Sequence, residues 1–299
     1  MPAHHHGHHH QGHHGRSHHG HDHGEGLAEL LDLDAEVLRE YHAGVVGWVR
    51  EHAAGREPAT IVDLGAGTGT GTLELLTQFP AASAVAVDSD AGMLDRLAAK
   101  AARRGLDGRI RTVVADLDAG WPAGLGEADL VWAANSMHHM ADPGRVLRDI
   151  HAALPAGGLL ALVELESFPR FLPADAGVGR PGLEERCHEA MAHRRAEDMP
   201  HLGADWAAAL TGAGFEVRAE RRFAADLAAP APEATGRYAL ASLRRAREAL
   251  ADDLADDLAD DDVAALDALL DEHGPHSILR RTDLTVRAER LGWIAARPS

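Results

Sequence analysis

A turn rich in glycine follows a short apolar segment and carries the strongest chemical signal in this chain. The apolar segment is Thr60–Leu64, with Asp63 next to its end, and the turn that follows contains Gly65, Gly67 and Gly69. Glycine adopts backbone conformations closed to other residues and lets a ligand approach the main chain. Because a turn that leads into a helix presents free N–H groups to an anionic or polar ligand, the pattern predicts a nucleotide-type pocket.

The spacing of these glycines argues against a dinucleotide. The dinucleotide fingerprint needs a third small residue, and the three registers that begin at these glycines end instead on Thr70, Thr72 and Glu74. Asp63 would also lie close to a bound pyrophosphate and repel it. A cofactor with a cationic amino group and no phosphate is more compatible with that acid.

Residues 63–69 (Asp-Leu-Gly-Ala-Gly-Thr-Gly) resemble motif I of the class I S-adenosylmethionine-dependent methyltransferases, in which an apolar strand is followed by D/E-x-G-x-G-x-G. The resemblance implies an α/β fold: a Rossmann-like, seven-stranded, mostly parallel sheet of order 3-2-1-4-5-7-6, with helices on both faces and helical insertions. It also implies that S-adenosyl-L-methionine is the cofactor. The cofactor-binding residues that it implies in this turn are Asp63, Gly65, Ala66, Gly67 and Gly69.

A second acid, Asp88, ends the next predicted strand, 19 residues after Gly69. A carboxylate can accept a hydrogen bond from each of two ribose hydroxyls, so Asp88 is interpreted as a ribose ligand, with Ser89 beside it. The alternative for Asp88 is a cap for the helix that begins at Ala91. Ser89 or Asp90 could fill that role instead.

Two further strand ends complete the predicted cofactor site. In methyltransferases of this class, an acid at the end of the third strand accepts a hydrogen bond from the adenine amine, and the next backbone N–H meets the ring; here these are Asp116 and Leu117. The alternative for Asp116 is a turn aspartate. Asn135 ends the fourth strand, inside a segment (133–143) that resembles the one found in ubiquinone- and menaquinone-biosynthesis-type methyltransferases and their small-molecule relatives.

That segment contains His138 and His139, which the resemblance places on the substrate side of the site, near the methyl-bearing sulfonium. Methyl transfer from a sulfonium is an in-line displacement that depends on alignment, and it needs a base only when the nucleophile is a protonated hydroxyl or amine. Histidine, with an ordinary pKa of about 6.5, suits that role. Either residue is a candidate catalytic base, and the alternative is a structural histidine bonded to a backbone carbonyl.

The N-terminal segment 1–26 differs in composition from the rest of the chain. Of the 22 histidines, 12 lie between His4 and His23. It cannot build a core, so we expect disorder. Histidines at this density bind Zn²⁺, Ni²⁺ or Cu²⁺ readily, and both an expression tag and a physiological metal-handling segment remain open. The first six candidate metal ligands are His4, His5, His6, His8, His9 and His10.

Strands and helices alternate after a predicted helix over 27–54, which argues for a parallel sheet covered by helices. The hairpin formed by two later strands, 215–223 and 284–296, matches how class I methyltransferase sheets end. The domain is expected over 27–299, with helical lid insertions over the substrate at about 167–202 and 228–280. The five strands predicted before the first insertion are 60–64, 84–87, 110–115, 129–134 and 159–165.

An acidic run over 251–262 is regularly interrupted by leucine. Leu250, Leu254 and Leu258 recur at helical spacing, so the run predicts an amphipathic helix with a solvated acidic face. A Ca²⁺ site would need a loop with glycine and staggered oxygen ligands, which the run lacks.

Composition argues against several classes of protein. The net charge is −18 with histidines neutral, which makes nucleic acid a poor partner. A single cysteine, Cys187, leaves no intramolecular disulfide. No apolar run approaches the roughly 18 residues that a membrane span needs, and no signal peptide is visible. We therefore expect a cytoplasmic monomer or homodimer.

These observations predict a methyltransferase that moves the methyl group of S-adenosyl-L-methionine to a small-molecule acceptor by in-line displacement. Two alternatives from other classes stay open. One is a nicotinamide-dependent oxidoreductase, and the other is a metal-handling protein that acts through the histidine-rich tail.

Overall fold

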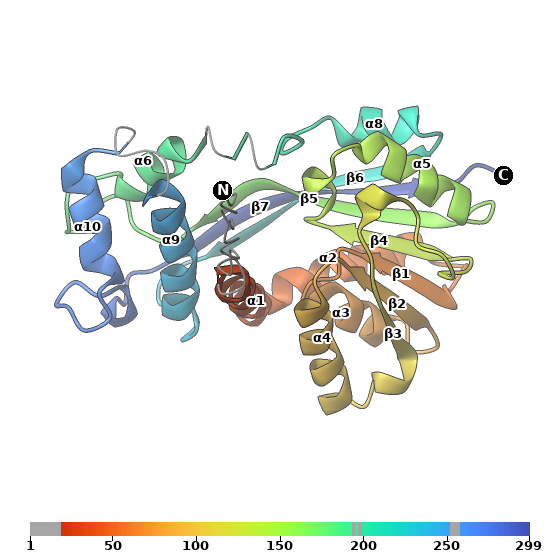
Figure 1. Cartoon of the computed structure of the whole chain (residues 1–299), viewed down its shortest axis with the longest axis horizontal. Helices are drawn as coiled ribbons and strands as arrows, with labels where there is room; N and C mark the ends of the chain where they lie inside the picture. Colours follow the sequence, from red (N-terminus) through yellow and green to blue (C-terminus); the bar gives the residue numbers. More distant parts are fainter. Residues whose placement is uncertain (1–18, 193–194, 197–198, 252–257) are drawn as a thin grey trace, which may run out of the picture.

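One seven-stranded sheet organises the chain in a computed structural model that describes residues 19–192, 195–196, 199–251 and 258–299 (Figure 1). The strand order is β3-β2-β1-β4-β5-β7-β6, which confirms the predicted order. Strands β1 to β5 pair in parallel, and β7 is antiparallel to both β5 and β6. The strands are β1 (Thr60–Leu64), β2 (Ser83–Asp88), β3 (Ile110–Val114), β4 (Leu130–Ala134), β5 (Leu159–Arg170), β6 (Glu216–Leu227) and β7 (Val286–Ala296).

The central strands are apolar on both faces because helices cover both faces of the sheet. Ile61 of β1 packs in a hydrophobic cluster with the helices of one face, and its neighbour Val62 packs in a cluster with those of the other, as strand alternation requires. The first face carries α2 (Arg39–His52), α3 (Thr70–Gln78) and α4 (Ala91–Arg103), and the second carries α5 (Pro143–Ala153) and α8 (Trp206–Gly212).

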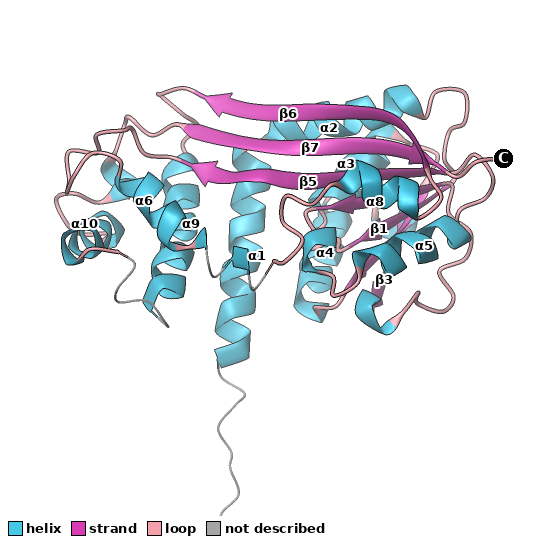
Figure 2. Ribbon diagram, turned by 90° about the horizontal axis from the view of Figure 1, so that it is seen from above, coloured by secondary structure: helices cyan, strands magenta, loops and turns pink. Residues whose placement is uncertain are grey.

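A second hydrophobic core lies where β5, β6 and β7 run on past the other strands (Figure 2). Phe171, Tyr238 and Leu266 are buried in it, and the rings of Phe171 and Tyr238 meet edge to face with centroids 4.9 Å apart. The helices of this core are α1 (His19–Val37), α6 (Leu183–Ala190), α9 (Thr235–Ala251) and α10 (Asp260–Leu270).

The predicted helix over 27–54 is in fact two helices, because α1 ends at Val37 and α2 begins at Arg39. The residue between them, Leu38, has φ −101° and ψ 28° and is buried in the second core. A straight helix could not pack one end on that core and the other end on the sheet, so the bend follows from tertiary packing. Helix α1 also begins at His19, earlier than the predicted start at Leu27.

The two predicted insertions supply most of the second core. The acidic run is only partly described, since residues 252–257 lie outside the described ranges. Its last acid departs from the prediction of a solvated face: Asp262 is buried and accepts hydrogen bonds from Arg180 and Arg186, at 2.5 and 2.7 Å.

Within the described ranges no helix combines the length and apolar character needed to cross a membrane.

Candidate active site

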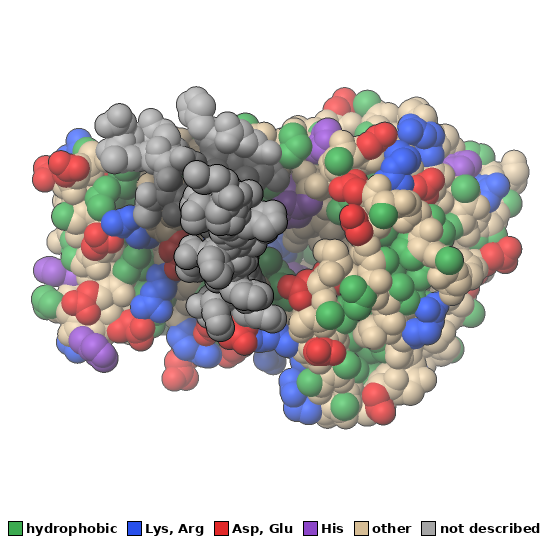
Figure 3. Space-filling model, in the orientation of Figure 1, with side chains coloured by type: hydrophobic (Ala, Val, Ile, Leu, Met, Phe, Trp, Pro, Cys, Tyr) green, Lys and Arg blue, Asp and Glu red, His purple; other side chains and the backbone are tan. Residues whose placement is uncertain are grey.

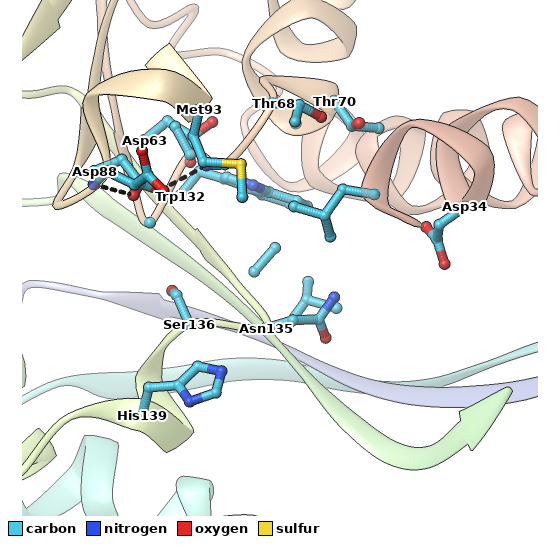
Figure 4. Close-up of a pocket in the computed structure, with 18 of the residues that line it drawn as sticks. Asp34, Asp63, Thr68, Thr70, Asp88, Met93, Trp132, Asn135, Ser136 and His139 are labelled. Carbon is cyan, nitrogen blue, oxygen red and sulfur yellow. Dashed lines mark hydrogen bonds between the residues drawn. The ribbon is translucent and has the colours of Figure 1, made fainter. Parts of the chain in front are cut away.

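A cavity of about 530 Å³ opens at the carboxyl ends of β1, β2 and β4 (Figure 4). Open α/β sheets bind their ligands at this edge, and the volume lies within the range of small-molecule sites. Helices α1 and α2 form an apolar wall on the other side, with Leu27, Leu31, Val45 and Val46. The cavity therefore lies between the sheet and the two N-terminal helices.

The structure brings most of the predicted site residues to this one cavity, although they come from four separate segments. Two predicted residues, Gly69 and His138, do not line it. Those that do are Asp63, Gly65, Ala66, Gly67, Asp88, Ser89, Asp116, Leu117, Asn135 and His139.

Two glycines of the turn are required by close packing as well as by backbone conformation. Gly65 has φ +70°, and a Cβ there would lie 2.4 Å from Cβ of Ser136. Gly69 has φ +86°, and a Cβ there would lie 2.4 Å from Cγ of Leu97 in α4. Left-handed φ values strain any residue with a side chain. Gly69 therefore lets the turn pack closely against α4, and it does not line the cavity.

Asp88 joins the end of β2 to the glycine-rich turn. Its Oδ2 accepts a hydrogen bond from the backbone N–H of Gly67 at 2.8 Å, and its Oδ1 accepts one from that of Asp90 at 2.9 Å. The cap of α4 is Asp90, whose side chain accepts from the N–H of Gly92 at 2.7 Å. Each oxygen of Asp88 keeps a second lone pair, so the carboxylate retains capacity for two ligand hydroxyls.

Asp116 adopts the geometry of a turn aspartate, which was the alternative interpretation of this residue. Its Oδ1 accepts from the N–H of Asp118 at 2.8 Å, and Asp118 in turn accepts from the N–H of Ala141 at 3.0 Å. This chain of bonds links the end of β3 to the segment after β4. No described residue bonds the second oxygen of Asp116, so the turn role leaves it available at the cavity.

Asp63 is a buried acid, with 2 % of its surface exposed. Burial raises its pKa to about 7; the nearby charge of Asp88 acts in the same direction, and the hydrogen bond that Thr72 Oγ1 donates at 2.5 Å opposes it. The carboxyl of Asp63 has no cationic partner among the described residues. A cationic ligand in the cavity would favour its ionised form.

Asn135 has a strained backbone at the end of β4. Among the described residues it is the one non-glycine residue with a positive φ, at +52°. Its N–H donates to the carbonyl of Val163 at 2.8 Å, while its side-chain Oδ1 is buried without a hydrogen-bond partner in the described chain. Strain of this kind concentrates at functional sites.

The two candidate bases have different environments. His138 is 1 % exposed, and its Nδ1 is hydrogen-bonded to Glu164 Oε2, while Oε1 of Glu164 accepts from the N–H of Met137 at 2.8 Å. Strand alternation explains this: Val163 lines the cavity, so Glu164 points to the opposite face. His139 does line the cavity, and its ring centroid lies 4.2 Å from that of His138.

A buried polar cluster lies at the far end of the cavity, and its two charged members, Asp34 and Arg290, were not predicted from the sequence. Asp34 of α1 lies at its centre and accepts hydrogen bonds from His42 Nε2, Tyr238 Oη and Arg290 Nη2, at 2.7, 2.7 and 2.9 Å. Asp34, Tyr41, His42 and Arg290 all line the cavity. The alternation of β7 could have indicated Arg290, because it shares a strand face with the buried Ala288.

The described part of the chain contains no group of three or more His, Cys, Asp or Glu side chains that could hold a metal ion. The six candidate ligands of the tail, His4 to His10, lie outside the described residues.

Known proteins resemble this chain most clearly over the first half of the sheet. Residues 61–158 match the family model described as a methyltransferase domain. Trans-aconitate 2-methyltransferase of Azoarcus sp. (strain BH72) is 37% identical over 106 residues, which is 36% of this chain and 39% of that protein. Malonyl-[acyl-carrier protein] O-methyltransferase of Dechloromonas aromatica (strain RCB) is 34% identical over 108 residues, 36% of this chain and 37% of that protein. The chain thus spans well under half the length of these relatives.

Solved structures resemble nearly the whole chain. A candidate methyltransferase from Bacillus halodurans C-125 matches with a TM-score of 0.53 and 16% identity, over 85% of this chain and 99% of that one. The [4+2]-cyclase SpnF matches with a TM-score of 0.50 and 18% identity, over 92% and 97%. Likeness at these identities shows the fold alone. Together with the matched domain, the strand order and the motif at residues 63–69, it supports one conclusion: residues 61–158 belong to a methyltransferase domain, within a fold like that of the class I S-adenosylmethionine-dependent methyltransferases.

Proposed function

We propose that this protein transfers the methyl group of S-adenosyl-L-methionine to a small-molecule acceptor by in-line displacement. The glycine-rich turn, Asp88, Asp116 and Asn135 all line one cavity, and this arrangement supports the proposal most strongly. Four strand ends contribute to it, and all lie on the edge of the sheet where such folds bind ligands.

The residues present fit this cofactor better than a dinucleotide. Asp63 is a buried acid without a cationic partner among the described residues, which suits the cationic amino group of a sulfonium amino acid and disfavours a pyrophosphate. Asp88 would accept the ribose hydroxyls, and Asp116 with the N–H of Leu117 would hold the adenine. When bound, S-adenosylmethionine supplies an already activated methyl group, so the chain has mainly to align the acceptor.

The acceptor would approach from the side of β4 and β5, where Asn135 and His139 line the cavity. His139 would accept the proton of a hydroxyl or amine acceptor. His138 stays an alternative base, but Glu164 holds its Nδ1 and its ring is buried away from the cavity. Its geometry favours a positioning role, in which it supports the His139 side of the turn.

Our expectations about partners and location stay predictions. The net charge of −18 supports a small molecule over nucleic acid as the acceptor. A cytoplasmic monomer or homodimer remains our expectation. So does binding of Zn²⁺ or Ni²⁺ by the histidine-rich tail, of which residues 1–18 lie outside the described ranges.

Methyl transfer must be measured directly, because a fold shared with a [4+2]-cyclase does not by itself specify transfer. The purified protein should be given methyl-labelled S-adenosylmethionine and a panel of acids, phenols and amines. The names of the two relatives put trans-aconitate and a malonyl thioester in that panel. We expect label in one acceptor class, and much less with Asp88→Ala. Cofactor binding with no transfer to any class would contradict the proposed reaction.

A further inference from the structure

Arg290 has more hydrogen-bond donors than the folded chain has acceptors for them. It lies on β7, lines the cavity and is 5 % exposed. A guanidinium carries five N–H donors. Within the described residues its one hydrogen-bond acceptor is Asp34 Oδ1, and its Nε is buried with no partner at all. A buried donor without an acceptor is unfavourable, so this end of the cavity calls for acceptors that a ligand would bring.

As the side chains lie, Asp34 takes up only one of the five donors of Arg290, through Nη2, and its carboxylate also accepts from His42 and Tyr238. Burial alone would raise its pKa, but the charge of Arg290 and the hydrogen bonds from His42 and Tyr238 hold the pKa of Asp34 below its ordinary value. It is therefore an ionised carboxylate that can only accept, with Arg290 and Tyr238 on one oxygen and His42 on the other.

Tyr41 adds another donor to the same end of the cavity. Its Oη is buried without a hydrogen-bond partner in the described chain, and its ring lies against Arg290, whose Cζ is 5.1 Å from the ring centroid. Burial raises the pKa of Tyr41 and the charge of Arg290 opposes that rise, so the phenol stays protonated at neutral pH and can donate.

This donor-rich end lies far from the cofactor residues on β1, β2 and β3. In the sheet, β7 is three strands from β1, which at the usual spacing is roughly 14 Å. Arg290 pairs with Leu165 of β5, and Val163, two residues earlier on the same face, also lines the cavity. The labelled side chains of Asp34 and Asp88 accordingly lie on opposite sides of the cavity (Figure 4).

We propose that Arg290 and Tyr41 bind a carboxylate of the methyl acceptor. The planar guanidinium and the phenol offer the donors that two carboxylate oxygens accept. The Asp34–Arg290 pair is neutral in sum, so directed hydrogen bonds from the guanidinium and the phenol, and not net charge, would hold the carboxylate. Between the two ends, Leu31 and Val45 form part of an apolar wall, which suits a carboxylate joined to an apolar body.

The inference rests on the proposed function, and a binding experiment tests it without knowledge of the natural acceptor. The full chain is first saturated with S-adenosylhomocysteine and then titrated in a calorimeter with straight-chain carboxylates from butanoate to octanoate, and with the amide of each. We expect at least one carboxylate to bind, and its amide to bind about tenfold more weakly or worse.

Two variants and a matched control locate the effect. Arg290→Lys keeps a positive charge beside Asp34, so folding is supported, but it removes the guanidinium donors and should weaken the carboxylate by about 10- to 100-fold. Tyr41→Phe should weaken it by a smaller factor. Arg287→Lys changes the same residue type on the same strand, at an exposed position outside the cavity, and should leave binding unchanged.

Several results would overturn the inference. Equal binding of a carboxylate and its amide, unchanged binding in Arg290→Lys, or no binding by any member of the series would each do so. Loss of S-adenosylhomocysteine affinity in Arg290→Lys, with carboxylate binding intact, would assign the site to the carboxylate of the cofactor. If the wild-type protein fails to bind S-adenosylhomocysteine, the proposed function itself fails, and that result is visible before any carboxylate is added.

Discussion

Asp63 shows at the scale of one residue how burial prepares the site for a cation. Its pKa is raised from an ordinary 3.8 to about 7 by burial. Between these two values the folded state keeps the proton that the unfolded state has released. Linkage then requires the free energy of unfolding to fall as pH rises through this window. The contribution of Asp63 to stability is thus fully present below about pH 4 and lost near pH 7.

Asp63→Asn tests this, because asparagine cannot ionise and still accepts a hydrogen bond from Thr72. We expect the free energy of unfolding of the wild-type protein, relative to that of the variant, to decrease as pH rises between about 4 and 7. Urea denaturation at a series of pH values measures the difference. Parallel curves for the two proteins would show that Asp63 has an ordinary pKa.

Some site residues could be predicted from sequence and others could not, for a physical reason. Asp63, Asp88 and Asp116 each follow a strand directly, so local pattern and the rule for open sheets placed them at the cavity. Asp34 and Arg290 are 256 positions apart in the sequence, and they meet only because the tertiary structure brings α1 to β7 at this point. No local pattern records that pairing, although alternation in β7 marks Arg290 as a buried charge that needs a partner.

At the scale of the element, the glycine-rich turn is held in place by α4. Leu97 of α4 packs against the turn, and a side chain at Gly69 would enter the space that Leu97 fills. The motif therefore requires glycine for two distinct reasons. Gly65 and Gly69 leave room for Ser136 and Leu97, and Gly67 lines the cavity with a left-handed φ of +52°.

Two glycine-to-alanine variants separate backbone strain from clash. Gly69 and Gly105 both have a left-handed φ, at +86° and +68°, but a Cβ at Gly105 would have no neighbour within 4 Å. We expect Gly105→Ala to lower the free energy of unfolding by about 1–2 kcal/mol from strain alone. Gly69→Ala should lower it by about 2–5 kcal/mol, because overpacking adds to the strain. Equal losses in urea denaturation would contradict the packing role of Gly69.

The break between α1 and α2 shows where prediction of elements fails. Apolar residues recur at helical spacing on both sides of Leu38, so the sequence predicts one uninterrupted helix over 27–54. The chain bends because Leu38 joins the second core while Val45 and Val49 join the core of the sheet. A competition between two cores is a property of the tertiary structure, and helical periodicity contains no sign of it.

At the scale of the whole molecule, the two insertions hold α1, one wall of the cavity, in position. We predicted them as lids over the substrate, yet none of their described residues lines the cavity. They instead hold α1: Tyr238 of α9 donates to Asp34, and Arg237 pairs with Glu36 at 3.4 Å (Figure 1). On the face shown in the space-filling view, acidic and basic side chains are interspersed with hydrophobic ones (Figure 3). Helix α1 therefore contributes the covering wall, and the insertions fix its position.

The strand order was the most predictable property of the molecule, because a motif at the first strand and alternating elements identify the fold as a whole. The longer range of β5, to Arg170, was missed because its apolar pattern ends at Leu165, where the sheet leaves its helical cover. Beyond that point the strand is buried by the second core only in part.

Calorimetric titration of the full chain with S-adenosylhomocysteine and with NADH distinguishes a cavity that binds S-adenosylmethionine from one that binds a dinucleotide. We predict one-to-one binding of S-adenosylhomocysteine and none of NADH. Asp88→Ala should reduce the affinity by about 1.5–3 kcal/mol, whereas Asp205→Ala, which removes the cap of α8 outside the cavity, should not change it. Binding of NADH without S-adenosylhomocysteine, or undiminished affinity in Asp88→Ala, would contradict the account.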